Sequence, residues 1–369
     1  MGWPDKQNGG RLGAVSGEGT AARAAHRRRD QCGMSGPLLH RRFPEAAGAL
    51  PREPLGDGPT PVRELGGLTC RVPLWCKDES GYGRGGWGGN KVRKLEWILP
   101  DVRRRGARTI LTVGGTGTNW GLATALYARE RGLRTAVALV DQPVDDHVRR
   151  QLERLRRSGA TLHFTRTKAR TIAAAPWLFL RHSAHGHLPY FLPAGGSSPV
   201  GTLGCVEAAL ELADQIAAGA LPEPSHVVTA VGSGGTAAGL ALGLRLAGLE
   251  RTRVVGVVVN DTLRLDARAV AALAGRTERL LRARGADLPR GVVAPDDVTL
   301  VRDWLGPGYG HPTPRGTEAR RLAAEGAGLD LEPVYTAKAL GALLDMADGG
   351  RFGDGPVLFL QTHGPRDGG

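Results

Sequence analysis

Apolar and polar residues follow two rhythms from about residue 96 to the C-terminus. Short runs rich in Val, Ile and Leu alternate with longer stretches whose apolar residues recur every three or four positions, which predicts strands separated by helices. Strands joined by such helices form parallel sheets with right-handed crossovers. We expect strands at residues 109–113, 135–140, 161–164, 190–192, 226–231, 253–259 and 357–361. We expect helices at residues 119–131, 145–158, 168–182, 201–218, 234–246, 263–284, 314–325 and 336–348.

These elements fall into two series, which predicts two α/β domains with a cleft between them. The smaller domain would hold residues 96–200, and the larger would combine residues 36–95 with 201–369. Each domain would have three layers, α/β/α, around a mostly parallel sheet. Residues 1–35 are rich in Gly, Ala and Arg without periodicity, so we expect an extension that lacks fixed structure. Met34 is a candidate translation start beside Met1.

Composition narrows the class of protein. The chain has 369 residues, 41% of them hydrophobic, and no apolar run reaches the roughly 18 residues of a membrane span. Its net charge of +13 comes from arginines spread over many predicted helices, so neither nucleic acid nor a membrane is an expected partner. The four cysteines have neither CxxC nor metal-ligand spacing, which predicts a reduced, cytoplasmic protein without a metal site.

The strongest chemical signal is Lys91, in the segment GGNKVRKLE at residues 88–96. Only six of the 49 basic residues are lysines, so a lysine behind two glycines at the start of an apparent helix stands out. A lysine amine can lose its proton and attack a carbonyl, whereas a guanidinium stays protonated. Lys91 is therefore a candidate for carbonyl chemistry. On spacing alone, a solvated lysine at a helix start is the alternative.

Three glycine-rich turns follow predicted strands. The segment VGSGGTAAG at residues 231–239 opens a helix, and its backbone N–H groups and helix dipole suit an anion. The segment also fits the loose dinucleotide-binding fingerprint, with Asp261 beyond the next strand. A nicotinamide-dependent dehydrogenase is therefore an alternative function, and a tight turn that binds no ligand is an alternative role for the segment. The turns at residues 114–121 and 195–199 end strands of the smaller domain, where sheets of this class bind ligands. Tyr309 and Tyr335 are candidate acid–base groups. The alternative is that each tyrosine only packs in the core.

Together these segments resemble the 1-aminocyclopropane-1-carboxylate deaminase / D-cysteine desulfhydrase family, pyridoxal phosphate (PLP) enzymes of the tryptophan synthase β-like fold (fold type II). The resemblance implies PLP as cofactor, a small amino acid as substrate and a homodimer. The dehydrogenase interpretation gives Lys91 no role. The resemblance covers about residues 60–364 and rests on seven segments in the family's order: KDES at 77–80, GGNKVRKLE at 88–96, GG with TN at 114–119, residues 192–204, GSGGT at 232–236, GYG at 308–310 and PVYTAK at 333–338.

The resemblance also implies a role for individual residues. Lys91 would bond covalently to the cofactor and act as the base, Asn119 would hydrogen-bond the 3′-oxygen of the ring, and Thr336 would meet the pyridine nitrogen. The other catalytic side chains would be Thr118, Tyr309 and Tyr335. The substrate would contact Thr118, Asn119, Trp120 and Ser197. The cofactor would be held by Lys91, Lys94, Asn119, Gly232, Ser233, Gly234, Gly235, Thr236 and Thr336, with residues 232–236 around its phosphate.

A neutral Thr336 at the pyridine nitrogen implies a weaker electron sink than a carboxylate would give. We therefore expect α,β-elimination, as in desulfhydrases, from a small amino acid, with D-configured ones among the candidates, giving a 2-oxo acid and ammonia. Ring opening of 1-aminocyclopropane-1-carboxylate and PLP binding without turnover are the alternatives. Trp120, the turn at residues 84–87 and His363 depart from the family's pattern, which leaves room for a specialised substrate.

Overall fold

The structure is a computed structural model that describes residues 1–2 and 36–365. The chain divides into two units, Met1–Pro37 and Leu38–Gly369, and every element described below belongs to the second unit. The extension predicted over residues 1–35 and the candidate start at Met34 lie outside the described residues, apart from residues 1 and 2.

A six-stranded sheet forms the centre of the larger part of this unit, in the order β1-β2-β11-β8-β9-β10. Neighbouring strands are parallel, except that β1 is antiparallel to β2. The antiparallel pair of β1 and β2 thus forms one edge of the sheet, whose other strands are joined by crossover connections. The strands are β1 (Val62–Glu64), β2 (Leu74–Asp78), β8 (His226–Val231), β9 (Arg253–Val258), β10 (Val298–Val301) and β11 (Val357–Gln361).

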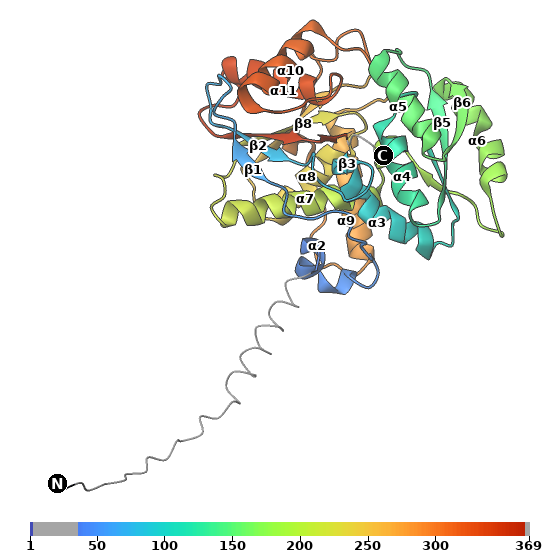
Figure 1. The fold of residues 1–369 in the computed structure, drawn as a ribbon, viewed down its shortest axis with the longest axis horizontal. Helices are drawn as coiled ribbons and strands as arrows, with labels where there is room; N and C mark the ends of the chain where they lie inside the picture. Colours follow the sequence, from blue (N-terminus) through green and yellow to red (C-terminus); the bar gives the residue numbers. More distant parts are fainter. Residues whose placement is uncertain (3–35, 366–369) are drawn as a thin grey trace. The chain divides into compact units, whose positions relative to one another are not determined.

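Helices cover both faces of the large sheet (Figure 1). Val227 belongs to a core formed with helices α7, α8 and α9, whereas the next residue, Val228, belongs to a second core with α11. Successive strand residues point to opposite faces, so a sheet buried on both sides needs nearly continuous apolar strands. The helices are α3 (Asn90–Arg104), α7 (Pro199–Ala217), α8 (Gly235–Leu246), α9 (Ala267–Ala283), α10 (Pro314–Ala327) and α11 (Thr336–Asp348), with the short α2 (Leu38–Arg42).

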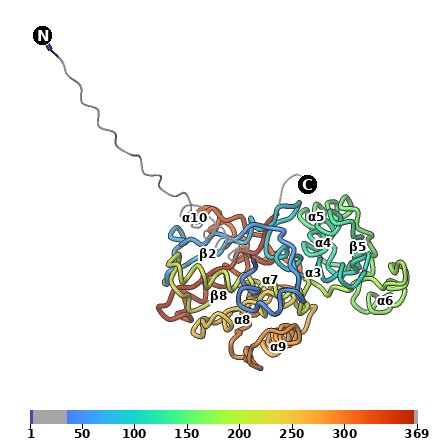
Figure 2. Tube along the Cα trace, turned by 90° about the horizontal axis from the view of Figure 1, so that it is seen from below, coloured from blue at the N-terminus to red at the C-terminus, as the bar shows by residue number. Residues whose placement is uncertain are grey.

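A four-stranded parallel sheet, in the order β6-β5-β4-β7, lies with its helices beside the rest of the unit (Figure 2). Val137 and Leu139 of β5 join the main core with helices α4 and α5, whereas Ala136 and Ala138 join a small separate core with α6. The two helix layers are therefore packed against opposite faces. The elements are β4 (Thr109–Gly115), α4 (Asn119–Arg129), β5 (Arg134–Val140), α5 (Asp146–Arg157), β6 (Thr161–Arg166), α6 (Lys168–His182) and β7 (Tyr190–Leu192).

The predicted α/β class with mostly parallel sheets and helices on both faces is confirmed. Strands β1, β2 and β10 were not predicted, because short strands with polar residues carry little periodic signal. The helix expected at 263–284 begins only at Ala267, where Asp266 Oδ1 accepts from Ala269 N at 2.7 Å and caps it. The domain boundaries stay a prediction. The boundary predicted between residues 95 and 96 lies within helix α3. Every helix within residues 1–2 and 36–365 is too short or too polar to cross a bilayer.

Candidate active site

Lys91 is held at the start of α3 by a two-stranded sheet. The strand β3 (Gly88–Gly89) pairs antiparallel with β12 (His363–Gly364). Gly89 has a φ of 93°, and a Cβ at this position would lie 2.5 Å from the carbonyl oxygen of Thr362. Only glycine fits such a turn. The turn places Lys91 on the wall of the cavity described below.

The environment of Lys91 favours its neutral amine. Its Nζ lies 3.4 Å from Asn90 Oδ1, a long contact for a hydrogen bond. Burial and, after it, the positive charge of Lys94 lower the pKa of Lys91 to about 8, although the negative charge of Glu332 acts in the opposite direction. A neutral lysine is therefore accessible near physiological pH, as a nucleophile or a general base requires.

Lys94 lies one helical turn further along α3 and is 3% exposed. Its Nζ donates to the carbonyl oxygen of Gly195 at 3.0 Å, and no carboxylate among the described residues forms an ion pair with it. Burial lowers its pKa. Because an ammonium buried without a counter-charge is costly, this position fits a bound anion.

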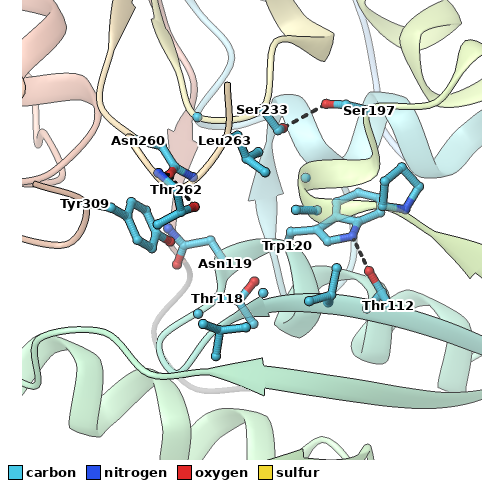
Figure 3. Close-up of a pocket in the computed structure, with 18 of the residues that line it drawn as sticks. Thr112, Thr118, Asn119, Trp120, Ser197, Ser233, Asn260, Thr262, Leu263 and Tyr309 are labelled. Atoms are coloured by element: carbon cyan, nitrogen blue, oxygen red, sulfur yellow. Dashed lines mark hydrogen bonds between the residues drawn. The ribbon is translucent and has the colours of Figure 1, made fainter. Parts of the chain in front are cut away.

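The loop of residues 232–236, which follows β8 and includes the first two residues of α8, lies beside that ammonium. Ser197 Oγ accepts from Gly235 N at 3.0 Å and lies 2.8 Å from Ser233 Oγ (Figure 3). A Cβ at Gly235 would lie 3.0 Å from Lys94 Nζ, so the loop backbone and the ammonium can share one anion. Thr236 Oγ1 is held from the other side by Asn90 Nδ2, at 2.9 Å. These residues fit the phosphate of PLP.

The start of α4 forms another wall of the cavity. Thr118 caps the helix, since its Oγ1 accepts from Gly121 N at 3.1 Å, which leaves the hydroxyl hydrogen for a ligand. Asn119 Oδ1 accepts from Gln151 Nε2 at 2.5 Å, so Nδ2 is the atom that can donate into the cavity. Trp120 Nε1 donates to Thr112 Oγ1 at 2.9 Å, as Figure 3 shows. Trp120 therefore offers the cavity an apolar ring rather than a proton donor.

Tyr309 and Tyr335 meet edge to face, with ring centroids 6.3 Å apart, and Tyr335 Oη donates to Tyr309 Oη at 3.0 Å. Burial raises the pKa of both phenols, so both carry their protons at neutral pH. Asp261 Oδ1 accepts from the backbone N–H of Tyr309 at 3.0 Å. Asp261 therefore holds the loop that carries Tyr309.

Thr336 is buried, and its Oγ1 accepts from Glu332 N at 2.8 Å. It is not among the residues that line the cavity, so its contact with the pyridine nitrogen stays a prediction. Glu332 does line the cavity, and its Oε2 accepts from Tyr335 N at 2.6 Å. Burial raises the pKa of Glu332 to about 7, although these backbone hydrogen bonds and the charge of Lys91 oppose the rise. This carboxylate was not predicted from the sequence, because a glutamate before a proline, four residues ahead of a helix, has no distinctive spacing.

One cavity of about 740 Å³ brings the predicted site together. Asn260 also lines it, and its Oδ1 accepts from Thr262 Oγ1 at 2.7 Å beside Tyr309 (Figure 3). No group of three His, Cys, Asp or Glu side chains in the described chain could hold a metal ion. The predicted site residues on the cavity wall are Lys91, Lys94, Thr118, Asn119, Trp120, Ser197, Gly232, Ser233, Gly234, Gly235, Thr236, Tyr309 and Tyr335.

Comparison with known proteins identifies the family of the chain. The sequence profile of the family described as "Pyridoxal-phosphate dependent enzyme" matches residues 54–362. A D-cysteine desulfhydrase of Klebsiella pneumoniae (strain 342) is 38% identical over 323 residues, covering 85% of this chain and 94% of the relative. The D-cysteine desulfhydrase of Salmonella choleraesuis (strain SC-B67) is 38% identical over 283 residues, covering 75% and 82%.

Solved structures show the same likeness. The crystal structure of an ACC deaminase homologue superposes with a TM-score of 0.71 at 28% identity, covering 89% of this chain and 95% of that one. An O-ureido-L-serine synthase, at 18% identity and a TM-score of 0.56, covers 85% and 90% and shares the fold. The chain belongs to the pyridoxal-phosphate dependent enzyme family. It is a PLP-dependent lyase or deaminase with the tryptophan synthase β-like fold, and the dehydrogenase interpretation is wrong.

Proposed function

We propose that this enzyme catalyses α,β-elimination from a small amino acid with a leaving group on Cβ, and that D-cysteine is the first candidate substrate. The observation that carries the proposal is the pairing of Lys91, whose pKa is about 8, with the buried anion site at Lys94 in one cavity. The desulfhydrase relatives support sulfide as the leaving group. Cysteine and water would give pyruvate, hydrogen sulfide and ammonia.

Each end of the cofactor would be held by residues of this chain. When bound, PLP supplies an electron-accepting ring conjugated to the substrate amine. Lys94 and the loop of residues 232–236 would bind its phosphate, and Lys91 would hold it covalently. Asn119 Nδ2 would donate to the 3′-oxygen of the ring. The Thr118 hydroxyl would donate to the substrate carboxylate, with Trp120 and Ser197 beside it.

Proton transfer would fall to two groups. The neutral Lys91 amine would remove the proton from Cα, since its lowered pKa makes that form accessible. The Tyr309 hydroxyl would donate its proton to the departing sulfur, and the hydroxyl of Tyr335, 3.0 Å away, would hold Tyr309 in place. Burial raises the pKa of both phenols, so each is protonated when the leaving group departs.

The test is an assay of pyruvate and sulfide with D- and L-cysteine, using the PLP-loaded enzyme and the variants Lys91→Ala and Arg170→Ala. Arg170 is exposed in the first turn of α6 and does not line the cavity, so it serves as the control for the loss of a positive charge. We expect Lys91→Ala to lower kcat by about 10³-fold or more, because it removes the base, and Arg170→Ala to stay near wild type. Full turnover by Lys91→Ala would contradict the mechanism.

Opening of a cyclopropane substrate is the second candidate function. Glu332 favours it, because a carboxylate on the cavity wall can strengthen the electron sink that Thr336 alone would leave weak. The likeness to the ACC deaminase homologue also supports it. Formation of 2-oxobutanoate from 1-aminocyclopropane-1-carboxylate, with no pyruvate from either cysteine, would establish ring opening instead of elimination.

We also infer that the enzyme acts as a homodimer in the cytoplasm. The family resemblance supports the dimer. Cys70, Cys76 and Cys205, the cysteines that the structure describes, are all free thiols, which supports a reducing compartment. Light scattering of the purified enzyme tests the first point, and fractionation of cells the second.

A further inference from the structure

The cavity extends beyond the residues that would hold PLP and a three-carbon amino acid. Its volume of about 740 Å³ falls in the range of about 300–1,000 Å³ that takes a drug-sized ligand. Part of its wall is polar and carries Lys91, Lys94 and Asn119. Another part, here called the apolar arm, is lined by side chains of β4, β5, β7 and α6: Leu111, Val113, Ala138, Leu178, Phe179 and Phe191.

Helix α6 covers the apolar arm without filling it. Leu178 is the one buried residue of its 15. Ala175 of α6 and Ala138 of β5 both line the arm, and neither side chain reaches far into it. Protein cores are normally packed to crystal-like density, so small side chains on both walls leave room for an apolar ligand group.

The arm joins the reaction site at the end of β4. Val113 lines the arm, and the next two residues, Gly114 and Gly115, line the cavity without side chains. A Cβ at Gly115 would clash with the side chain of Gln142 and lie 3.2 Å from Cε1 of Tyr309, so both side chains pack against this strand end. Val113 and Tyr309 line the same cavity, so a group that departs beside Tyr309 shares one space with the apolar arm.

We propose that the preferred substrate carries an apolar substituent on its leaving group, as an S-alkyl- or S-benzylcysteine does, and that the apolar arm binds this substituent. The proposal rests on the elimination function above. The Cβ–S bond breaks with its electron pair on sulfur, the Cα proton passes to Lys91, and the thiolate takes a proton. Water supplies the oxygen of the 2-oxo acid, so the substrate and water yield a thiol, pyruvate and ammonium without any oxidant or reductant.

The experiment compares racemic S-benzylcysteine with racemic cysteine, using the PLP-loaded enzyme and the variants Ala175→Phe and Ala173→Phe. Ala173 is exposed on the same helix and does not line the cavity, so it controls for the added ring. We expect wild type to prefer S-benzylcysteine by about tenfold or more in kcat/KM, since a single methylene in an apolar pocket is worth about 10–200-fold. Ala175→Phe should lower kcat/KM for S-benzylcysteine by about 30-fold and change that for cysteine less than about threefold, whereas Ala173→Phe should change neither.

A second readout keeps the two proposals separable. Titration calorimetry with S-benzylcysteine, with Lys91→Ala added to each variant so that the ligand is not consumed, should show a dissociation constant about tenfold weaker in Ala175→Phe than in Ala173→Phe. If neither amino acid yields pyruvate, the proposed elimination is wrong. The difference in dissociation constant between the two variants then tests by itself whether the apolar arm binds the substituent. Pyruvate from cysteine, with equal behaviour of the two variants toward S-benzylcysteine, would overturn the arm alone. Should Ala175→Phe not fold, Ala175→Leu and Ala173→Leu form the same comparison.

Discussion

Two charges of opposite sign tune the amine of Lys91. Lys94, on the same face of α3, lowers its pKa, and Glu332, on the wall of the same cavity, raises it. Glu332 in turn has a pKa of about 7, so its charge changes in the range where the enzyme would work. The acid–base state of the site thus depends on a carboxylate four residues before Thr336, and not on the lysine pair alone.

Replacing this carboxylate gives a prediction for the pH dependence of the rate. In Glu332→Gln the lost negative charge should lower the pKa of Lys91 further, so more of the base is neutral at any given pH. The rise of kcat/KM with pH should therefore move to lower pH, and kcat/KM at pH 7 should increase by about twofold. Stopped assays of cysteine turnover across the pH range measure this. Glu332→Asp, which keeps the charge, is the control, and a profile that moves to higher pH would show that Glu332 acts in another way.

At the scale of elements, α3 is anchored by a buried ionic cluster. Arg93 and Glu79 are each 1% or less exposed and form an ion pair, and Arg93 Nη2 also donates to Glu211 Oε1 at 2.9 Å. Lys77 Nζ lies 2.7 Å from the same Glu211 oxygen. The cluster joins α3 to β2 and α7, and so it fixes the helix from which Lys91 and Lys94 project.

Removing the arginine at the centre of this cluster should be strongly destabilising. Arg93→Met leaves two carboxylates buried beside one remaining ammonium, which should lower the free energy of unfolding by about 3–5 kcal/mol. Arg149→Met is the matched control, since Arg149 pairs with Asp146 on the surface and such pairs contribute about 0–1 kcal/mol. Urea unfolding followed by circular dichroism measures both variants. Similar losses in the two would mean that the cluster does not stabilise α3.

The same elements show what the sequence could and could not predict. Lys91 and the loop of residues 232–236 were predicted from local motifs whose neighbouring residues indicate their chemistry, whereas the role of Lys94 was predicted only from the family resemblance. The segment KDES at residues 77–80 resembles a family signature, but its sequence does not reveal the ion pair between Glu79 and Arg93. Glu79 and Arg93 are 14 residues apart and Lys77 and Glu211 are 134 apart, so no short-range spacing in the sequence indicates these ion pairs. The apolar arm was missed for the same reason, since its walls come from β4, β5, β7 and α6.

For the whole molecule, the two larger sheets share one cavity and the chain carries a net charge of +13. Ser197, which follows β7 of the small sheet, and Ser233, which follows β8 of the large one, meet at 2.8 Å beside the anion site. An anion bound there contacts elements of both sheets. Ligands that bind only the folded state stabilise it, so anion binding should be visible as added stability of the entire unit.

Inorganic phosphate should therefore stabilise the PLP-free enzyme. At a phosphate concentration of about ten times its dissociation constant, the free energy of unfolding should rise by about 1.4 kcal/mol. Because the net charge of +13 attracts any anion, sodium chloride at equal ionic strength is the necessary control and should give a much smaller rise. Lys94→Met should remove the specific gain, since it deletes the buried ammonium beside the loop, whereas Arg170→Met, at an exposed position off the cavity wall, should keep it. Equal stabilisation of wild type and Lys94→Met by phosphate would show that the anion binds elsewhere on the positive surface, and the assignment of residues 232–236 to the cofactor phosphate would then fail.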